Sequence, residues 1–301
     1  MTLRPVELTQ RPSLTARVGG YIALTKPRII ELLLVTTLPT MIVARRGLPS
    51  LWLMVATLIG GACAAGGANA INMYVDRDID KVMQRTRKRP LVTGVMAPRN
   101  ALIFAVVLEG IAFAELWGFV NLLSAVLAVS ATLFYVFVYT LWLKRRSSQN
   151  IVIGGAAGAV PVLVGWAAVT DHLTWTPLVL FAIIFVWTPP HFWALAFKYK
   201  EDYQAADVPM LPAVATFART ARAILVYSVL LVGVTLVLAP VASLGVVYLV
   251  AASLLGLVFV GMAARLRWRA TPKAAMQLFS YSITYLTLLF VLMAVDIFTK
   301  H

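Results

Sequence analysis

The sequence predicts an all-α polytopic membrane protein whose nine transmembrane helices form a single bundle. Of its 301 residues, 61% are hydrophobic and only 13% are charged. Nine apolar runs approach or reach the ~20 residues that an α-helix needs to cross a bilayer. In lipid, only helices or closed barrels satisfy the backbone, and runs of this length are typical of helices. The runs lie at residues 29–44, 51–71, 101–118, 120–142, 151–170, 176–197, 223–240, 242–264 and 276–298.

These runs cover the chain so closely that they leave no room for a separate soluble domain. We therefore expect a cytoplasmic N-terminal tail at residues 1–20 and one transmembrane domain at residues 21–301. Residues 1–20 contain no apolar core of a signal peptide. The single cysteine, Cys63, lies inside the second run and excludes an intrachain disulfide.

The net charge of +14 could indicate a nucleic-acid-binding protein, but the distribution of the charge argues against that class. Of the 26 Lys and Arg residues, 23 lie before the first run or in alternate connecting segments, and the other side has only Arg45, Arg46 and Lys300. By the positive-inside rule, this asymmetry predicts a cytoplasmic N-terminus, a periplasmic C-terminus and an odd number of spans. A bacterial inner membrane fits these features best.

The most polar stretch, residues 72–91, directly follows the second apolar run. It contains three of the 12 acidic residues and six of the 26 basic ones. If the preceding helix continues, Asn72, Asp76 and Asp80 lie four residues apart on one face. Hard oxygen ligands of this kind suit Mg²⁺, which typically takes one or two carboxylates together with substrate phosphates. The stretch predicts a magnesium–diphosphate site, and the alternative is a solvated loop whose charges only set the topology.

Basic residues near this stretch could neutralise a diphosphate. Lys26 and Arg28 flank Pro27 ahead of the first run, and Lys144 and Arg145 follow the fourth. The alternative for each is an interface anchor whose charge reaches the lipid headgroups. The stretch itself adds Lys81, Arg85, Arg87, Lys88 and Arg89.

A second polar stretch closes the sixth run, on the same side of the membrane. His191, Lys198 and Asp202 are spaced seven and then four residues apart, which would place them on one helical face. The two stretches could therefore hold one diphosphate through a bridging metal. His191 lies about two turns inside the apolar run. There it could either act as a ligand or make a structural hydrogen bond.

These stretches resemble the UbiA superfamily of intramembrane prenyltransferases. The superfamily's first motif, N-x-x-x-D-x-x-x-D, is met by Asn72, Asp76 and Asp80. The superfamily's second motif is commonly D-x-x-x-D, but here Lys198 replaces the first acid and leaves Asp202. Further segments resemble the branch that farnesylates haem, namely residues 24–28, 85–91, 154–159, 188–193 and 209–212.

The resemblance implies a UbiA-like fold and transfer of farnesyl from farnesyl diphosphate to a vinyl group of haem B, with addition of water, to form haem O. It implies that His191 faces the haem and that the lipid bilayer surrounds the enzyme, with a haem A synthase or terminal oxidase as candidate assembly partners. It implies catalytic roles for Asn72, Asp76, Asp80, Lys198 and Asp202, with Mg²⁺ held by Asn72, Asp76, Asp80 and Asp202. It implies diphosphate binding by Lys81, Arg85, Arg89, Lys144, Arg145, Lys26 and Arg28.

The sequence is also compatible with two other functions. The first is prenyl transfer to an aromatic quinone precursor such as 4-hydroxybenzoate, against which the segment 188–191 (Thr-Pro-Pro-His) argues. The second is secondary transport. Transporters usually place their polar sites near the bilayer midplane, whereas the acidic residues here lie at the cytoplasmic ends of the runs.

Overall fold

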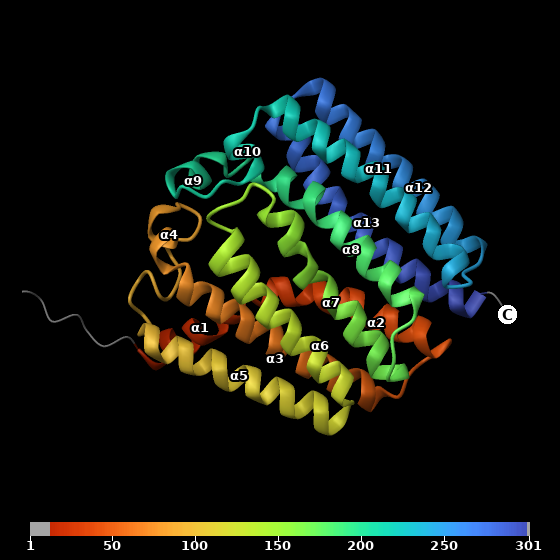
Figure 1. Ribbon diagram of the computed structural model, residues 1–301, viewed down its shortest axis with the longest axis horizontal. Helices are drawn as coiled ribbons and strands as arrows, with labels where there is room; N and C mark the ends of the chain where they lie inside the picture. The colour runs from red at the N-terminus through yellow and green to blue at the C-terminus, as the bar shows by residue number, and fades with distance from the viewer. Residues whose placement is uncertain (1–12, 300–301) are drawn as a thin grey trace, which may run out of the picture.

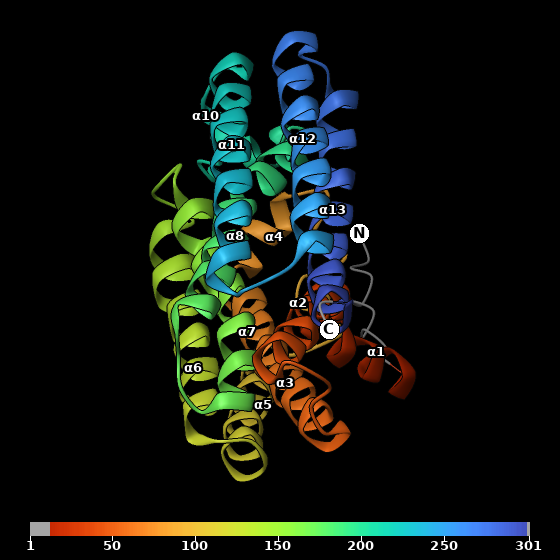
Figure 2. The ribbon, with the colours of Figure 1, turned by 90° about the vertical axis from the view of Figure 1, so that its right-hand side faces the viewer.

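The computed structural model describes residues 13–299, apart from the side chains of residues 28, 29 and 32–34. Its described part is helical, and Figure 2 shows the long helices aligned roughly along one direction. The short helices are α1 (Leu14–Thr25), α4 (Arg77–Val82), α9 (Lys200–Ala205) and α10 (Leu211–Val214). The longer ones are α2 (Pro27–Arg45), α3 (Leu51–Val75), α5 (Pro98–Phe119), α6 (Leu122–Leu133) with its extension η1 (Phe134–Leu143), α7 (Asn150–Thr170), α8 (Trp175–Ala196), α11 (Phe217–Val241), α12 (Val246–Arg269) and α13 (Pro272–Thr299).

Each of the nine predicted spans lies on one of these long helices, which confirms the all-α membrane fold. Eight helices of the described chain are long and apolar enough to cross a bilayer, with α6 and η1 counted as one. The remaining predicted span, 29–44, lies on α2, where several side chains fall outside the described residues. The expected boundary between tail and membrane domain, at residues 20 and 21, lies inside α1.

The helices pack in chain order around the bundle. Successive long helices from α5 to α13 contact one another, and α13 returns to pack on α2. Figure 1 shows that α4, α9 and α10 lie together at one end of the bundle. The segments after α3 and after α8 therefore meet at this end.

Glycines let the central helices approach closely. A Cβ at Gly67 of α3 would lie 2.6 Å from Oε1 of Glu109 on α5, and a Cβ at Gly154 of α7 would overlap the ring of Tyr139 on η1. Small residues are typical of such contacts. In lipid the hydrophobic effect does not drive helices together, so van der Waals contacts between closely packed helices must stabilise their association. The carboxylate of Glu109 also accepts a hydrogen bond from Thr132 Oγ1 (3.1 Å).

Candidate active site

Asn72, Asp76 and Asp80, which we call the ladder, lie at the junction of α3 and α4. Helix α3 ends at Val75, and Asp76 joins it to α4 with φ −84° and ψ 4°. The backbone N–H of Asp76 nevertheless donates to Asn72 O and that of Asp80 to Asp76 O, both at 2.9 Å. The helical hydrogen bonds between residues four apart therefore continue across the break between the helices. All three side chains are buried, with Asn72, Asp76 and Asp80 3%, 0% and 2% exposed.

Asp76 is the most enclosed of the three. Its Oδ2 accepts a hydrogen bond from Asn72 Nδ2 (2.7 Å) and pairs with the ammonium of Lys144. Its Oδ1 is buried without a hydrogen bond from the described residues and lies 3.8 Å from Arg145 Nη2. One oxygen of a buried carboxylate thus retains free coordinating capacity.

Asp80 is neutralised by a different cation. Its Oδ2 lies 2.6 Å from Arg89 Nη1. The loop that supplies Arg89 is fixed by the buried Thr86, whose hydroxyl donates to the backbone carbonyl of Asp80 (3.0 Å). Arg89 therefore reaches the ladder because the chain after α4 turns back on it.

Lys26 approaches the ladder from the corner between α1 and α2. It has φ 52°, a left-handed conformation that costs a residue with a Cβ roughly 1–2 kcal/mol. Its Nζ donates to Asn72 Oδ1 (3.1 Å). Burial, and secondarily the charges of Arg89 and Lys144, lower the pKa of Lys26 to about 7, so a bound anion would favour its charged form. The side chain of Arg28 lies outside the described residues.

The extension η1 is a π-helix, and it brings two side chains to the ladder. The backbone N–H of Lys144 donates to Tyr139 O (2.8 Å), five residues earlier. Thr140 Oγ1 donates to Tyr135 O (2.9 Å) and accepts from Asn72 Nδ2 (3.2 Å). Thr140 was not among the predicted site residues, because the sequence does not show where an α-helix continues as a π-helix.

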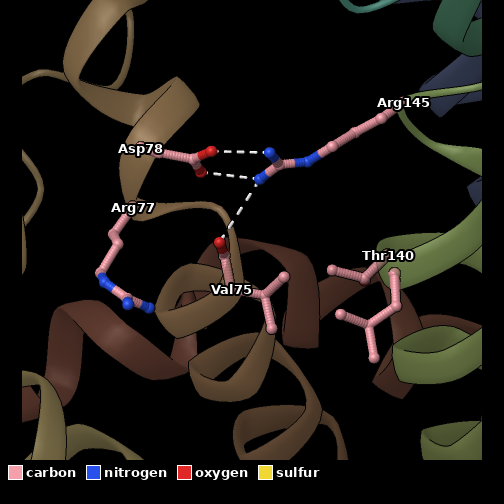
Figure 3. Close-up of a pocket in the computed structure, with 6 residues that line it drawn as sticks. Val75, Arg77, Asp78, Thr140 and Arg145 are labelled. Atoms are coloured by element: carbon pink, nitrogen blue, oxygen red, sulfur yellow. Dashed lines mark hydrogen bonds and ion pairs between the residues drawn. The ribbon is translucent and has the colours of Figure 1, made fainter.

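A pocket of about 430 Å³ lies beside the ladder, and Figure 3 shows it between the α3–α4 junction and η1. Arg145 crosses it to make two hydrogen bonds with Asp78, of 2.6 and 2.7 Å. This pairing holds the pKa of Asp78 to about 2 and raises that of Arg145. The lining residues are Val75, Arg77, Asp78, Thr140, Leu141 and Arg145.

The second polar stretch does not form one helical face, so that expectation was wrong. Helix α8 ends at Ala196 and α9 begins at Lys200, because i+3 hydrogen bonds tighten the chain between them. Lys198 lies in this turn and is exposed. The two oxygens of Asp202 accept hydrogen bonds from the backbone N–H of Gln84 (3.0 Å) and Arg85 (3.1 Å). The two polar stretches do meet, and Asp202 makes the contact.

Arg85 is held over this junction. Its Nη2 donates to the hydroxyl of Tyr203 (3.3 Å), and its guanidinium lies over the rings of Tyr199 and Tyr203. Burial raises the pKa of the Tyr203 phenol. Tyr203 was not among the predicted site residues, and Lys81, which was, is exposed.

His191 lies on α8 and contacts α13. It is 8% exposed, and its Nδ1 lies 2.6 Å from Ser282 Oγ. The ring stacks on Trp187 with centroids 4.2 Å apart and lies 4.7 Å from the ring of Phe279. Ser282 and Phe279 were not predicted, because they lie about 90 residues away in sequence.

The ladder suits a magnesium ion that arrives with a phosphate ligand. Its donors are hard oxygens, and Oδ1 of Asp76 accepts no hydrogen bond from the described residues. In the part of the chain that is described, no three His, Cys, Asp or Glu side chains cluster closely enough to hold a metal by themselves. A metal here would therefore draw further ligands from water and from a substrate.

Comparison with known proteins identifies relatives of this chain and its fold. The model of the UbiA prenyltransferase family matches residues 33–292. A protein of Renibacterium salmoninarum named protoheme IX farnesyltransferase is 52% identical over 311 residues, covering 97% of this chain and 98% of the relative. One of the same name from Parafrankia sp. is 57% identical over 284 residues, covering 93% and 90%. A solved structure of a UbiA homologue from Archaeoglobus fulgidus bound to DMAPP and Mg²⁺ has the same fold, with a TM-score of 0.59 at 16% identity over 92% of this chain and 99% of that one.

Proposed function

The chain belongs to the UbiA prenyltransferase family, and on that premise we propose that it transfers the farnesyl group of farnesyl diphosphate to a vinyl group of haem B, with addition of water, to form haem O. The names of relatives that are more than half identical over nearly the whole chain support this donor and acceptor. The observation that carries the chemistry is the pairing of the buried Asp76 and Asp80 with Lys144 and Arg89.

In this proposal, the acids and cations of the ladder change partners when substrate binds. Asn72, Asp76 and Asp80 would hold Mg²⁺, which supplies Lewis-acid stabilisation of the diphosphate. Lys144 and Arg89 would then turn from the acids, and Lys26 from Asn72, to the phosphate oxygens. Cations placed beside a leaving group stabilise negative charge as it develops there.

The bond between C1 of farnesyl and the diphosphate oxygen breaks, and its electron pair leaves with the diphosphate. The vinyl group of haem attacks the allylic cation, and water then adds to the resulting carbocation and loses a proton. The apolar bundle excludes water from the first cation. Arg85 and Arg145 lie beside the site, and Lys81 and Lys198 are exposed at the same end, where they would attract the anionic substrate.

Two of the proposed roles depend on residues that have other partners in this structure. Asp202 would have to leave the amides of Gln84 and Arg85 to serve as a fourth metal ligand, as the resemblance implies. His191 would bind haem through the nitrogen that does not contact Ser282.

We further propose that the protein lies in a bacterial inner membrane with a cytoplasmic N-terminus and a periplasmic C-terminus. The 23 basic residues on one side support this orientation. Residues 1–20 would form the tail and residues 21–301 the membrane domain. A haem A synthase or terminal oxidase would be its assembly partner.

The test is a reaction of purified protein with haem B, farnesyl diphosphate and Mg²⁺, with and without EDTA, followed by mass analysis of the extracted haem. We expect a Mg²⁺-dependent product that carries farnesyl plus water. Asp76→Asn and Asp80→Asn should abolish turnover while folded protein remains in the membrane. Unchanged haem in folded wild-type protein would refute the proposal, and a parallel reaction with 4-hydroxybenzoate would identify the other acceptor.

A further inference from the structure

One residue of α13, Ser282, holds two aromatic side chains of α8 at once. Its backbone carbonyl accepts a hydrogen bond from Trp187 Nε1 (2.8 Å), and its hydroxyl lies 2.6 Å from His191 Nδ1. Trp187 and His191 stack on each other with an angle of 21° between their rings. Ser282 is fully buried. The orientation of the imidazole is therefore fixed by the stack and by one hydroxyl group.

The hydrogen positions around Ser282 Oγ follow from the number of hydrogen-bond donors there. Ser282 Oγ lies 2.6 Å from His191 Nδ1 and also 2.6 Å from Phe279 O. Each contact is short enough to require a hydrogen between the two atoms, but a serine hydroxyl has only one. A carbonyl cannot donate, so the hydroxyl hydrogen points to Phe279 O. The hydrogen between Oγ and Nδ1 must then belong to His191.

This assignment determines the other ring nitrogen. A neutral imidazole carries one hydrogen, so with Nδ1 protonated, Nε2 has a free lone pair. No described residue makes a hydrogen bond to Nε2, and His191 keeps 8% of its surface exposed. The lone pair of Nε2 is therefore not used by any described residue.

We propose that Ser282 is a positioning residue that fixes His191 as the Nδ1–H tautomer and so presents the lone pair of Nε2 to the iron of the porphyrin substrate. The hydrogen bond from a ring nitrogen to a neighbouring oxygen is the usual way in which proteins orient a metal-binding histidine. The porphyrin part rests on the proposed function, whereas the tautomer is a property of the protein alone. The two parts are tested separately.

The tautomer is tested by nitrogen-15 NMR of the full-length protein with labelled histidine. Only three histidines are present, so replacing His172 and His301 with Gln leaves the signals of His191 alone. We expect a protonated Nδ1 and an unprotonated Nε2. Ser282→Thr should keep this pattern, because it keeps the hydroxyl, and Ser282→Ala should shift His191 toward the Nε2–H form. Trp187 donates to a backbone carbonyl that all these variants retain, so the ring stack stays in place.

The matched control is Ser228→Ala. Ser228 is also fully buried and its hydroxyl also donates to a carbonyl of its own helix, Ile224 O at 2.7 Å, but this hydrogen bond does not involve His191. It should leave the spectrum unchanged. An Nε2–H signal in the wild type, or a spectrum that Ser282→Ala does not change, would overturn the tautomer assignment.

The ligand role is tested by titrating each variant with ferric haem and recording the visible spectrum. Ser282→Ala should weaken haem binding about tenfold, the lower end of the effect of losing such a hydrogen-bond partner. Ser282→Thr and Ser228→Ala should bind as the wild type does, and all should bind farnesyl diphosphate equally. A shifted tautomer with unchanged haem binding would overturn the ligand role and leave the tautomer assignment intact. Wild-type protein that binds no haem would refute the proposed function without changing the NMR result.

Discussion

Replacing Lys144 with Met should destabilise the protein more than replacing its ion-pair partner Asp76 with Asn. The two side chains differ in their access to water, since that of Asp76 is 0% exposed and that of Lys144 is 15% exposed. Without Lys144, the carboxylate stays buried, and Arg145, 3.8 Å away, is the one cation among the described residues that remains in an ion pair with it. Without Asp76, the ammonium can turn toward the aqueous end of the bundle.

The expected magnitudes follow from this difference. Removing one partner of a buried ion pair typically costs about 3–5 kcal/mol of stability. Because Arg145 remains near the carboxylate, we expect Lys144→Met to cost about 3 kcal/mol, the lower end of this range. Asp76→Asn loses hydrogen bonds but buries no charge, which corresponds to about 1 kcal/mol. The double variant also buries no unpaired charge and should again cost about 1 kcal/mol. The two substitutions are therefore expected to be non-additive by about 3 kcal/mol.

The assay is the free energy of unfolding of the four proteins in mixed micelles, in EDTA and then in Mg²⁺. In Mg²⁺ at 100 times its dissociation constant, Lys144→Met should recover up to about 2.7 kcal/mol, because the metal replaces the missing cation. The wild type should gain less, since Lys144 competes with the metal for Asp76. Costs that add to within about 0.5 kcal/mol would refute the reasoning, because they would mean that the pair is not coupled.

Three further predictions concern other parts of the site. Asp202→Asn should leave one of its two backbone amide partners unpaired and accelerate tryptic cleavage of the loop after α4; unchanged cleavage with weakened Mg²⁺ binding would instead favour the metal-ligand role. Gly154→Ala should lower the free energy of unfolding by roughly 1–3 kcal/mol, because the new Cβ overlaps the ring of Tyr139. In the control Gly158→Ala, the new Cβ meets nothing within 4 Å, so this variant should be neutral or stabilising. Equal stabilities of the two variants would contradict this prediction. Because the pKa of Lys26 falls from 10.5 to about 7 on folding, the unfolded chain binds more protons between these values, and the free energy of unfolding should rise with pH across that range. In Lys26→Met the rise should be smaller, and identical pH profiles would count against a lowered pKa.

The parts of the fold that the sequence predicted are those set by local pattern. Apolar runs of spanning length are visible without any tertiary information, and each was found on a helix. The spacing of Asn72, Asp76 and Asp80 predicted a shared face, and the backbone hydrogen bonds that link them preserve it across the break at Asp76. Local hydrogen bonding of this kind depends only on neighbouring residues.

The parts that could not be predicted depend on contacts between distant segments. Nothing near Asp202 indicates that its carboxylate binds amides more than 100 residues earlier, and nothing near Ser282 indicates a histidine 91 residues away. The continuous helix expected through His191, Lys198 and Asp202 failed for a related reason. The helix ends in i+3 hydrogen bonds after Ala196, and Asp202 then contacts the loop after α4, neither of which the spacing of polar residues encodes.

The π-helix η1 also has a consequence for how this chain can vary during evolution. A π-turn accommodates one more residue than an α-turn, so it corresponds to a single-residue insertion within a helix. Deleting one residue between Phe134 and Leu143 would let the segment relax to an α-helix. However, everything on one side of the deletion would then rotate by about 100° relative to the other, and Lys144 would no longer face Asp76. The length of this span should therefore tolerate insertion and deletion poorly.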